Sequence, residues 1–237
     1  GNQAAYSRVD EFTIDRTKPE VRVSYDNTQS IHQYYYAKVR TATIDILEHN
    51  FDVSNIKIEV TAQEGSVTPL VSGFLSQGDH HIAKIFFRED GDYSFTVAGM
   101  DFAENILEVY TEDHFVLDQT SPDIELVGIQ DYSANNGVVA PLLRFQDTNF
   151  DRENVSVEIE GYHNGIQNIK KTESKLTYGI ELQFDDFDYT AQMDDLYILK
   201  ATARDLAGND CEKIVTFSVN RFGSVYTFDR QTEQLAG

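Results

Sequence analysis

The chain has almost no cysteine, and it has no tryptophan. Cys211 is the single cysteine among 237 residues, so no disulfide can form within the chain. Any domain in it must therefore fold on its hydrophobic core alone. A low cysteine count is typical of a reducing compartment, but an extracellular protein whose domains need no disulfide would have the same count. Cysteine does not decide where this protein resides.

Basic residues are also scarce, and long apolar runs are missing. With 19 Lys and Arg against 40 Asp and Glu, the formal net charge is −21. This charge argues against nucleic acid or an anionic membrane surface as a partner, because both would repel it. No apolar stretch approaches the roughly 18 residues that a membrane-spanning helix needs. We expect a soluble monomer that does not insert into a membrane.

Residue patterns typical of an active site are missing as well. The six histidines are scattered, without the His-Glu-x-x-His or Cys-x-x-Cys spacing of zinc sites. Cys211 has no neighbouring histidine to activate its thiol. Neither a Gly-x-Ser-x-Gly elbow nor a phosphate-binding loop occurs. We therefore predict that the chain is not an enzyme.

What the sequence does contain is an internal repeat. The segment FTIDRTKPEV, which starts at Phe12, returns as FVLDQTSPDI at Phe115, 103 residues later. The triplet Asn-Phe-Asp at Asn50 returns at Asn149, 99 residues later. A period of about 100 residues is too long for a solenoid repeat and fits one small sandwich domain. The chain is therefore predicted to be a tandem array of two like domains.

Polar and apolar residues alternate with the period of a β-strand through most of both repeats, as at 20–25 and 155–159. The runs are rich in Val, Ile, Thr, Tyr and Phe, and turn residues interrupt them about every ten residues, which predicts an antiparallel sandwich. Strands are expected near 20–25, 35–47, 55–62, 69–75, 79–87, 92–101 and 105–117, and near 123–129, 138–146, 153–161, 165–171, 175–184, 195–204 and 211–219. Asn136-Gly137 and Asn164-Gly165 are predicted to form tight hairpin turns.

Two tyrosines predict the kind of sandwich. Tyr93 and Tyr197 each begin a strand, and each precedes an apolar residue by two positions, at Phe95 and Leu199. This is the pattern of the tyrosine corner in immunoglobulin-type sandwiches, where the hydroxyl bonds back to the turn. The alternative is that both tyrosines are ordinary core or surface residues. We predict an all-β fold of two tandem immunoglobulin-like antiparallel β-sandwich domains.

The repeated Asp-x-Thr-x-Pro motif sets the domain boundaries. Proline restricts its own backbone and pushes the preceding residue towards extended geometry, which suits a short, stiff connection. The first domain is predicted at 19–118 and the second at 119–221. Residues 1–18 are expected to be the tail of a preceding module or a linker, and 222–237 a C-terminal tail or the start of a next module.

A third repeated segment points to a family. DFAEN at 101–105 corresponds to DLAGN at 205–209, 104 residues later, and in each copy a strand and the Thr-x-Pro motif follow. This combination resembles the bacterial immunoglobulin-like repeats of Gram-positive cell-surface and adhesion-type proteins. The first copy departs from the pattern at Glu104, where glycine is usual, and we expect this residue to have a negative φ. The resemblance implies an extracellular fragment of a larger secreted or wall-anchored protein, with neighbouring domains as partners, but it implies no ligand.

Calcium is the one cofactor for which the sequence offers candidates, because this ion takes oxygen ligands from acidic side chains. The candidates near the junctions are Asp15, Asp101, Asp118 and Asp205, and those in one acidic stretch are Asp185, Asp186, Asp188, Asp194 and Asp195. No EF-hand loop occurs. The alternative is that these acids cap turns and keep the surface charged.

These observations leave two functions open. The chain is either a spacer or cell-adhesion array, or a module that binds a host glycan or protein through a sheet face or the crease between domains. Aromatic side chains would carry such binding, and the candidates are Tyr34, Tyr36, Phe187 and Tyr189. The absence of tryptophan counts against carbohydrate stacking.

Overall fold

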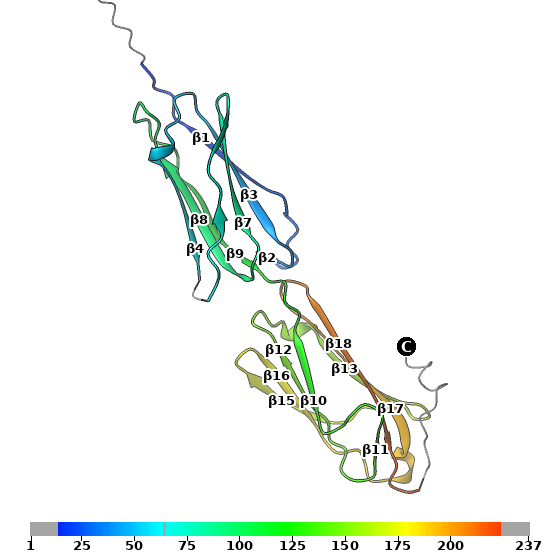
Figure 1. The fold of residues 1–237 in the computed structure, drawn as a ribbon. Helices are drawn as coiled ribbons and strands as arrows, with labels where there is room; N and C mark the ends of the chain where they lie inside the picture. The colour runs from blue at the N-terminus through cyan, green and yellow to red at the C-terminus, as the bar shows by residue number, and fades with distance from the viewer. Residues whose placement is uncertain (1–13, 64, 224–237) are drawn as a thin grey trace, which may run out of the picture. The chain divides into compact units, whose positions relative to one another are not determined.

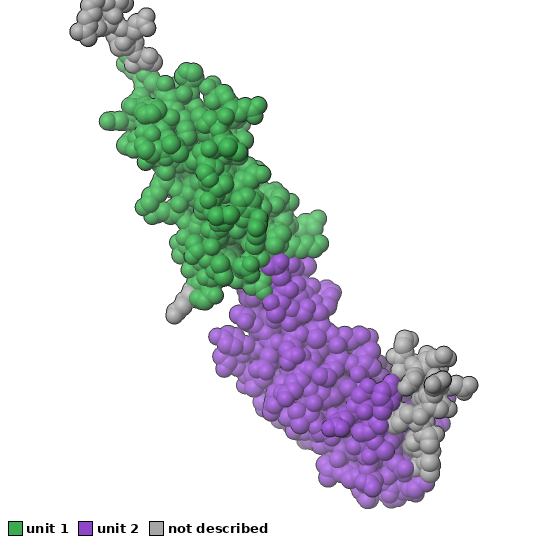
Figure 2. Space-filling view, in the orientation of Figure 1, with its two compact units in different colours: residues 1–29, 38–117 green, residues 30–37, 118–237 purple. Residues whose placement is uncertain are grey.

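A computed structural model describes residues 14–63 and 65–223 (Figure 1). The chain divides into two compact units, one of residues 1–29 with 38–117 and one of residues 30–37 with 118–237 (Figure 2). The main division falls after Leu117, one residue before the predicted boundary. Most of the predicted terminal segments, 1–18 and 222–237, lies outside the described residues.

The strands between Glu20 and Leu117 form two sheets. One has the order β1 (Glu20–Tyr25), β3 (Arg40–Leu47), β7 (His80–Phe87) and β5 (Leu70–Val71), with β6 (Leu75–Gln77) also paired to β7. The other has the order β2 (Tyr35–Tyr36), β9 (Tyr110–Leu117), β8 (Gly91–Gly99) and β4 (Ile56–Ala62). A 3-10 turn, η1 (Val53–Asn55), precedes β4.

The second unit repeats this topology. One sheet has the order β10 (Asp123–Val127), β12 (Leu142–Gln146), β16 (Gly179–Phe184) and β15 (Lys171–Leu176). The other has the order β11 (Ser133–Asn135), β18 (Asp210–Val219), β17 (Asp195–Arg204), β13 (Val155–Gly161) and β14 (Gly165–Ile166). The 3-10 turns are η2 (Arg152–Asn154) and η3 (Ala191–Met193). The strand β14 has no counterpart among the described strands of the first unit.

The predicted all-β fold of two tandem immunoglobulin-like sandwiches is confirmed. Alternation along each strand places one side chain in two on the inner face, so β3 is buried at every second residue. Both tyrosine corners are present: the hydroxyl of Tyr93 donates to the backbone oxygen of Glu89 at 2.9 Å, and that of Tyr197 donates to Met193 O at 3.0 Å. Their rings are fully buried, and a buried ring of this size contributes about 1.5–3 kcal/mol.

Several details of the predicted strands are wrong. The predicted strand 175–184 is divided between β15 and β16, and the predicted strand 35–47 is divided between β2 and β3, which lie in different sheets. Residues 105–109 are not part of β9, which begins at Tyr110. Asn136-Gly137 does not form a hairpin, because β11 before it pairs in parallel with β18, whereas β12 after it belongs to the other sheet. The pairing of β11 with β18 was not predicted, because the three residues of β11 are too few to show a strand period. Asn164-Gly165 does form a hairpin, between β13 and β14, with Gly165 at φ 62°.

No helix in the described part of the chain has the length and apolar character needed to cross a membrane.

Candidate functional site

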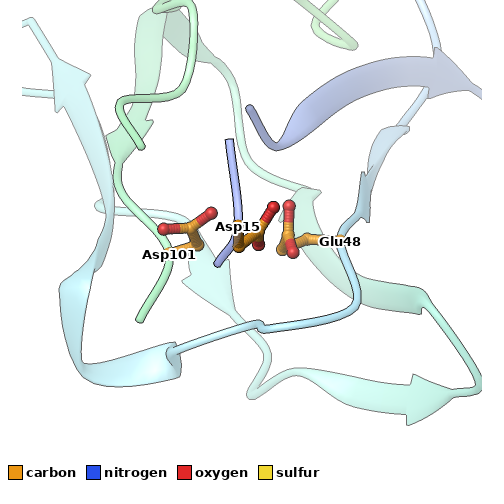
Figure 3. A group of neighbouring side chains, drawn as sticks. All are labelled: Asp15, Glu48 and Asp101. Carbon is orange, nitrogen blue, oxygen red and sulfur yellow. The ribbon is translucent and has the colours of Figure 1, made fainter. Parts of the chain in front are cut away.

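Three acidic side chains of the first unit meet at the end of the sandwich where its first strand begins. Asp15, Glu48 and Asp101 each offer one carboxylate oxygen, and these oxygens all lie within 4.8 Å of one another (Figure 3). Asp15 precedes β1, Glu48 directly follows β3, and Asp101 follows β8 by two residues. The antiparallel pairing of β1 with β3 brings the start of one strand beside the end of the other. We call this group the first acidic cluster.

The second unit has the equivalent group. Asp118, Asp147 and Asp205 also place one oxygen each within 4.8 Å of one another. Asp118 precedes β10, while Asp147 directly follows β12 and Asp205 directly follows β17. This second acidic cluster therefore uses the same three positions of the fold, with aspartate in place of Glu48.

Two repeated asparagines donate hydrogen bonds into each cluster. In the first, Asn50 Nδ2 donates to Asp15 Oδ2 at 2.7 Å, and Asn105 Nδ2 donates to Asp101 Oδ2 at 2.8 Å. In the second, Asn149 Nδ2 donates to Asp118 Oδ2 at 2.8 Å. The amide groups thus satisfy carboxylate oxygens at the end of each sandwich, which explains why Asn50 and Asn105 are among the repeated residues.

Asn209 makes the most extensive of these contacts. Its Nδ2 group lies 2.8 Å from Asp205 Oδ2 and 2.9 and 3.1 Å from the backbone oxygens of Asp118 and Thr120, so its two N–H hydrogens are shared among three acceptors. Its backbone N–H donates to Asp205 Oδ1 at 2.8 Å. Asn209 therefore joins the segment at the start of the second sandwich to the turn between β17 and β18.

The corresponding turn of the first unit corrects one expectation. Asp101 Oδ1 accepts hydrogen bonds from the backbone N–H groups of Ala103 and Asn105 at 2.8 and 2.9 Å, which shapes the turn. Glu104 has φ 65°, not the negative φ that we expected, and Gly208 in the second unit has φ 91°. The left-handed conformation costs a residue with a side chain about 1–2 kcal/mol. The turn geometry is retained in spite of this cost.

The carboxylates of the first cluster have an unusual electrostatic environment. Asp101 is only 1% exposed and Glu48 is buried too, and none of the three acids forms a salt bridge within the described residues. Hydrogen bonds from the Thr17 backbone and the Asn50 side chain hold the pKa of the Asp15 carboxyl below its usual value. Carboxylate oxygens grouped in this way are the ligand type that calcium prefers. The three carboxylates supply only part of the six to eight oxygens of a calcium site.

The structure brings some of the predicted calcium residues together and separates others. Asp118 and Asp205 share the second cluster, and Asp101 lies in the first. Sequence reasoning missed Glu48 and Asp147 as members, although each stands two residues before the repeated Asn-Phe-Asp triplet. That fixed spacing is the signal that would have identified them.

The acidic stretch before β17 has a different environment. Asp185, Asp186 and Asp188 belong to no such group of three acids within the described residues. Asp186 Oδ1 accepts hydrogen bonds from the Val139 N–H at 2.7 Å and from the guanidinium of Arg221. For Asp186 the structure therefore shows the turn-stabilising role that was the alternative to calcium binding.

The predicted ligand-binding aromatics fall into two groups. Phe187 is 1% exposed and packs against Tyr197 at 4.8 Å between ring centroids, and Tyr36 is also buried. The prediction that these two rings receive a ligand is wrong, because both face the interior. Tyr34 is partly exposed, and Tyr189 is 68% exposed, with Phe222 beside it at 5.3 Å.

Several solved structures are similar to this chain. A titin structure is 13% identical, with a TM-score of 0.44, and the match covers 86% of this chain and 100% of the titin chain. A second titin structure is 12% identical with a TM-score of 0.38 and coverages of 86% and 66%. A marsupial T cell receptor is 12% identical with a TM-score of 0.31 and coverages of 90% and 100%.

No protein-family model matches the sequence, and no curated protein matches it. The class of the protein follows from the strand order and the two tyrosine corners, which define tandem immunoglobulin-like domains.

Proposed function

We propose that this chain is a non-enzymatic spacer or adhesion module, made of tandem immunoglobulin-like repeats, within a larger protein of a bacterial cell surface. One observation carries this proposal: the repeated residues build the same scaffold in both units. They form the tyrosine corners, the turn at Asp101 and at Asp205, and the contacts of Asn105 and Asn209. Duplication has thus preserved architecture, which is what an array of spacers requires.

The contacts at the start of each sandwich suit this role. Asn209 holds the backbone of Asp118 and Thr120 against the turn at Asp205, and Pro122 lies two residues after Thr120. Asn105 makes the corresponding contact with the backbone oxygen of Asp15 at 3.4 Å. Each domain therefore controls the path of the chain at its own first strand, a property that limits bending in an array.

The proposed partners are neighbouring domains of the parent protein, and the proposed location is outside the cell. The resemblance of the turn and linker motifs to bacterial surface repeats supports both. A direct test is to label intact and permeabilised cells of the source organism with an antibody raised against residues 14–223. Labelling of intact cells is expected; labelling only after permeabilisation would contradict the location.

The spacer function and the ligand-binding alternative are separated by a binding screen. The two-unit chain would be applied to glycan and host-protein arrays, with calcium and with EDTA. We expect no specific ligand. A ligand whose binding is lost in Tyr189→Ala or Tyr34→Ala, the two candidates with exposed rings, would replace the spacer function with the binding function.

Calcium binding is a second candidate, favoured by the grouping of three carboxylates in each unit. A bound cation would offset the repulsion among them and would tie the first strand of each sandwich to its neighbouring turn. We expect thermal unfolding at a higher temperature in calcium than in EDTA, and a smaller shift in Asp205→Ala. Asp188→Asn, which changes a predicted candidate outside both clusters, is the matched control. Coincident melting curves of the unaltered protein would exclude this candidate.

A further inference from the structure

The strand β4 is an open edge of the first unit. Among the described strands only β8 pairs with it, along all seven residues from Ile56 to Ala62. No strand among residues 14–63 and 65–223 covers its other side, so the backbone N–H and C=O groups there can pair with a further strand. In the second unit the equivalent strand, β13, has β14 paired to its outer side at Gly161.

Natural edge strands are commonly protected from pairing by proline, by a bulge or by charges that point inward. The strand β4 has neither proline nor glycine, and its register with β8 shows no shift between Ile56 and Ala62. Its charged side chains lie on the outer face, because Ile56, Ile58 and Val60 occupy the half-buried positions. None of these three protections is present in β4; the exposed lysine that also commonly protects an edge is present as Lys57, where Glu59 offsets its charge.

The outer face of β4 carries one charge of each sign. Lys57 and Glu59 have side chains that are 71% and 59% exposed, and they form an ion pair with each other. Their partners across the sheet on β8 are Ala98 and Thr96, which carry no charge. Charged side chains on a strand added at the open edge can therefore form ion pairs with Lys57 and Glu59.

We propose that β4 pairs with β4 of a second copy of this chain, antiparallel and centred on Ile58. In this register Lys57 of each copy lies opposite Glu59 of the other, so the outer face acquires four charges of alternating sign. Ile56 lies opposite Val60 on the inner face. Opposite charges directly across paired strands are stabilising, and like charges are destabilising.

Other symmetric registers lack this complementarity. A pairing centred on Lys57 or on Glu59 places that charge opposite itself. A shift by a single residue would set inner side chains opposite outer ones, which the pleat of the sheet excludes. The charge pattern thus selects one register, and it does so only for a second copy of the same strand.

The second unit shows that this pattern is particular to β4. At the positions equivalent to Lys57 and Glu59, β13 has Ser156 and Glu158. Glu158 lies opposite Lys200 on the neighbouring strand β17, and Lys200 forms an ion pair with Glu212. Self-pairing of β13 in the same register would form no ion pair.

The net charge of −21 opposes association of two copies. One pair of seven-residue strands also forms a small interface, so the dimer is weak and transient, with a dissociation constant of about 0.1–1 mM. A dimer of this strength forms only where the chain is concentrated. It is independent of the proposed spacer function.

Sedimentation velocity over a range of concentrations up to about 1 mM tests the proposal. Lys57→Glu and Glu59→Lys each place two like-charged pairs in the interface, and we expect at least about tenfold weaker dimerisation for either alone. An equimolar mixture of the two variants should dimerise again, because the mixed pair restores both opposite-charge contacts. The double variant with both exchanges should also dimerise, at unchanged net charge.

Glu158→Lys is the matched control, since it makes the same charge change on the equivalent strand and should leave dimerisation unaltered. Circular dichroism would establish that each variant is folded. A chain that stays monomeric at about 1 mM would overturn the proposal. So would single variants that dimerise like the unaltered protein, or a mixture that remains monomeric.

Discussion

Replacement of Asn209 tests how the first strand of the second sandwich is held in place. Asn209→Ala removes three contacts of Nδ2, two with backbone oxygens and one with the Asp205 carboxylate. A neutral hydrogen bond contributes about 1 kcal/mol, and one to a charged acceptor about 1.5–3 kcal/mol. Because the two hydrogens of Nδ2 make at most one bond of each kind at a time, we expect the free energy of unfolding of the second unit to fall by about 2.5–4 kcal/mol.

Asn209→Asp keeps the shape of the side chain but replaces the donor with a carboxylate oxygen beside Asp205. Two like charges about 4 Å apart repel by about 4 kcal/mol at an effective dielectric constant of 20. At neutral pH without added cations, Asn209→Asp should therefore be less stable than Asn209→Ala. The difference should shrink in acid, because protonation of the carboxylates removes the repulsion.

Urea unfolding followed by circular dichroism measures both variants, with one transition fitted for each unit. Asn136→Ala is the control, because Asn136 is exposed, and a change there should stay within about 0.5 kcal/mol. If Asn209→Asp equals the unaltered protein in EDTA, the amide does not act as a donor to Asp205 and the reasoning is refuted. If calcium alone restores its stability, the cation candidate gains support.

Three further predictions concern the first unit. Tyr93→Phe should lower the free energy of unfolding by about 1 kcal/mol in urea titrations, because only the hydrogen bond of the corner is lost; an unchanged midpoint would contradict this. Glu104→Gly should raise it by about 0.5–1 kcal/mol, because relief of the left-handed strain exceeds the added freedom of the unfolded chain; a lower melting temperature would show otherwise. The pKa of Asp15 is lowered, mainly by the Thr17 N–H, so its stabilising contribution is present above the unfolded-state pKa and is lost as the pH falls through the folded-state pKa. Asp15→Asn should flatten the decline of stability below about pH 4, and identical acid profiles would count against it.

The scaffold could be predicted from the sequence because its signals are local. Alternation of polar and apolar residues depends only on neighbours within a strand, and the corner at Tyr93 depends on a residue four positions earlier. The short strands β2 and β11 could not be separated from their surroundings, because two or three residues show no period. The hairpin predicted at Asn136-Gly137 was wrong for a related reason. A turn sequence indicates that the chain reverses direction, but it does not indicate which sheet the next strand joins.

The candidate site could be predicted only in part. Asp101, Asp118 and Asp205 were identified because they lie in repeated segments near the junctions. Glu48 and Asp147 were not, since their proximity to the other acids arises from strands distant in sequence. Phe187 illustrates the reverse error, because a ring in an acidic loop was named as a ligand-binding candidate and instead packs on Tyr197.

The sequence by itself determined that this protein is a duplicated β-sandwich, since repetition and strand period are properties of a linear chain. Only the tertiary structure decided which acids meet, that Phe187 lies in the core, that Glu104 adopts a left-handed backbone, and that β4 has an open edge. Each of these depends on strand order or on backbone dihedral angles. Strand order and these dihedral angles are fixed only when segments distant in sequence pack together. One local sequence pattern is compatible with several strand orders and backbone conformations.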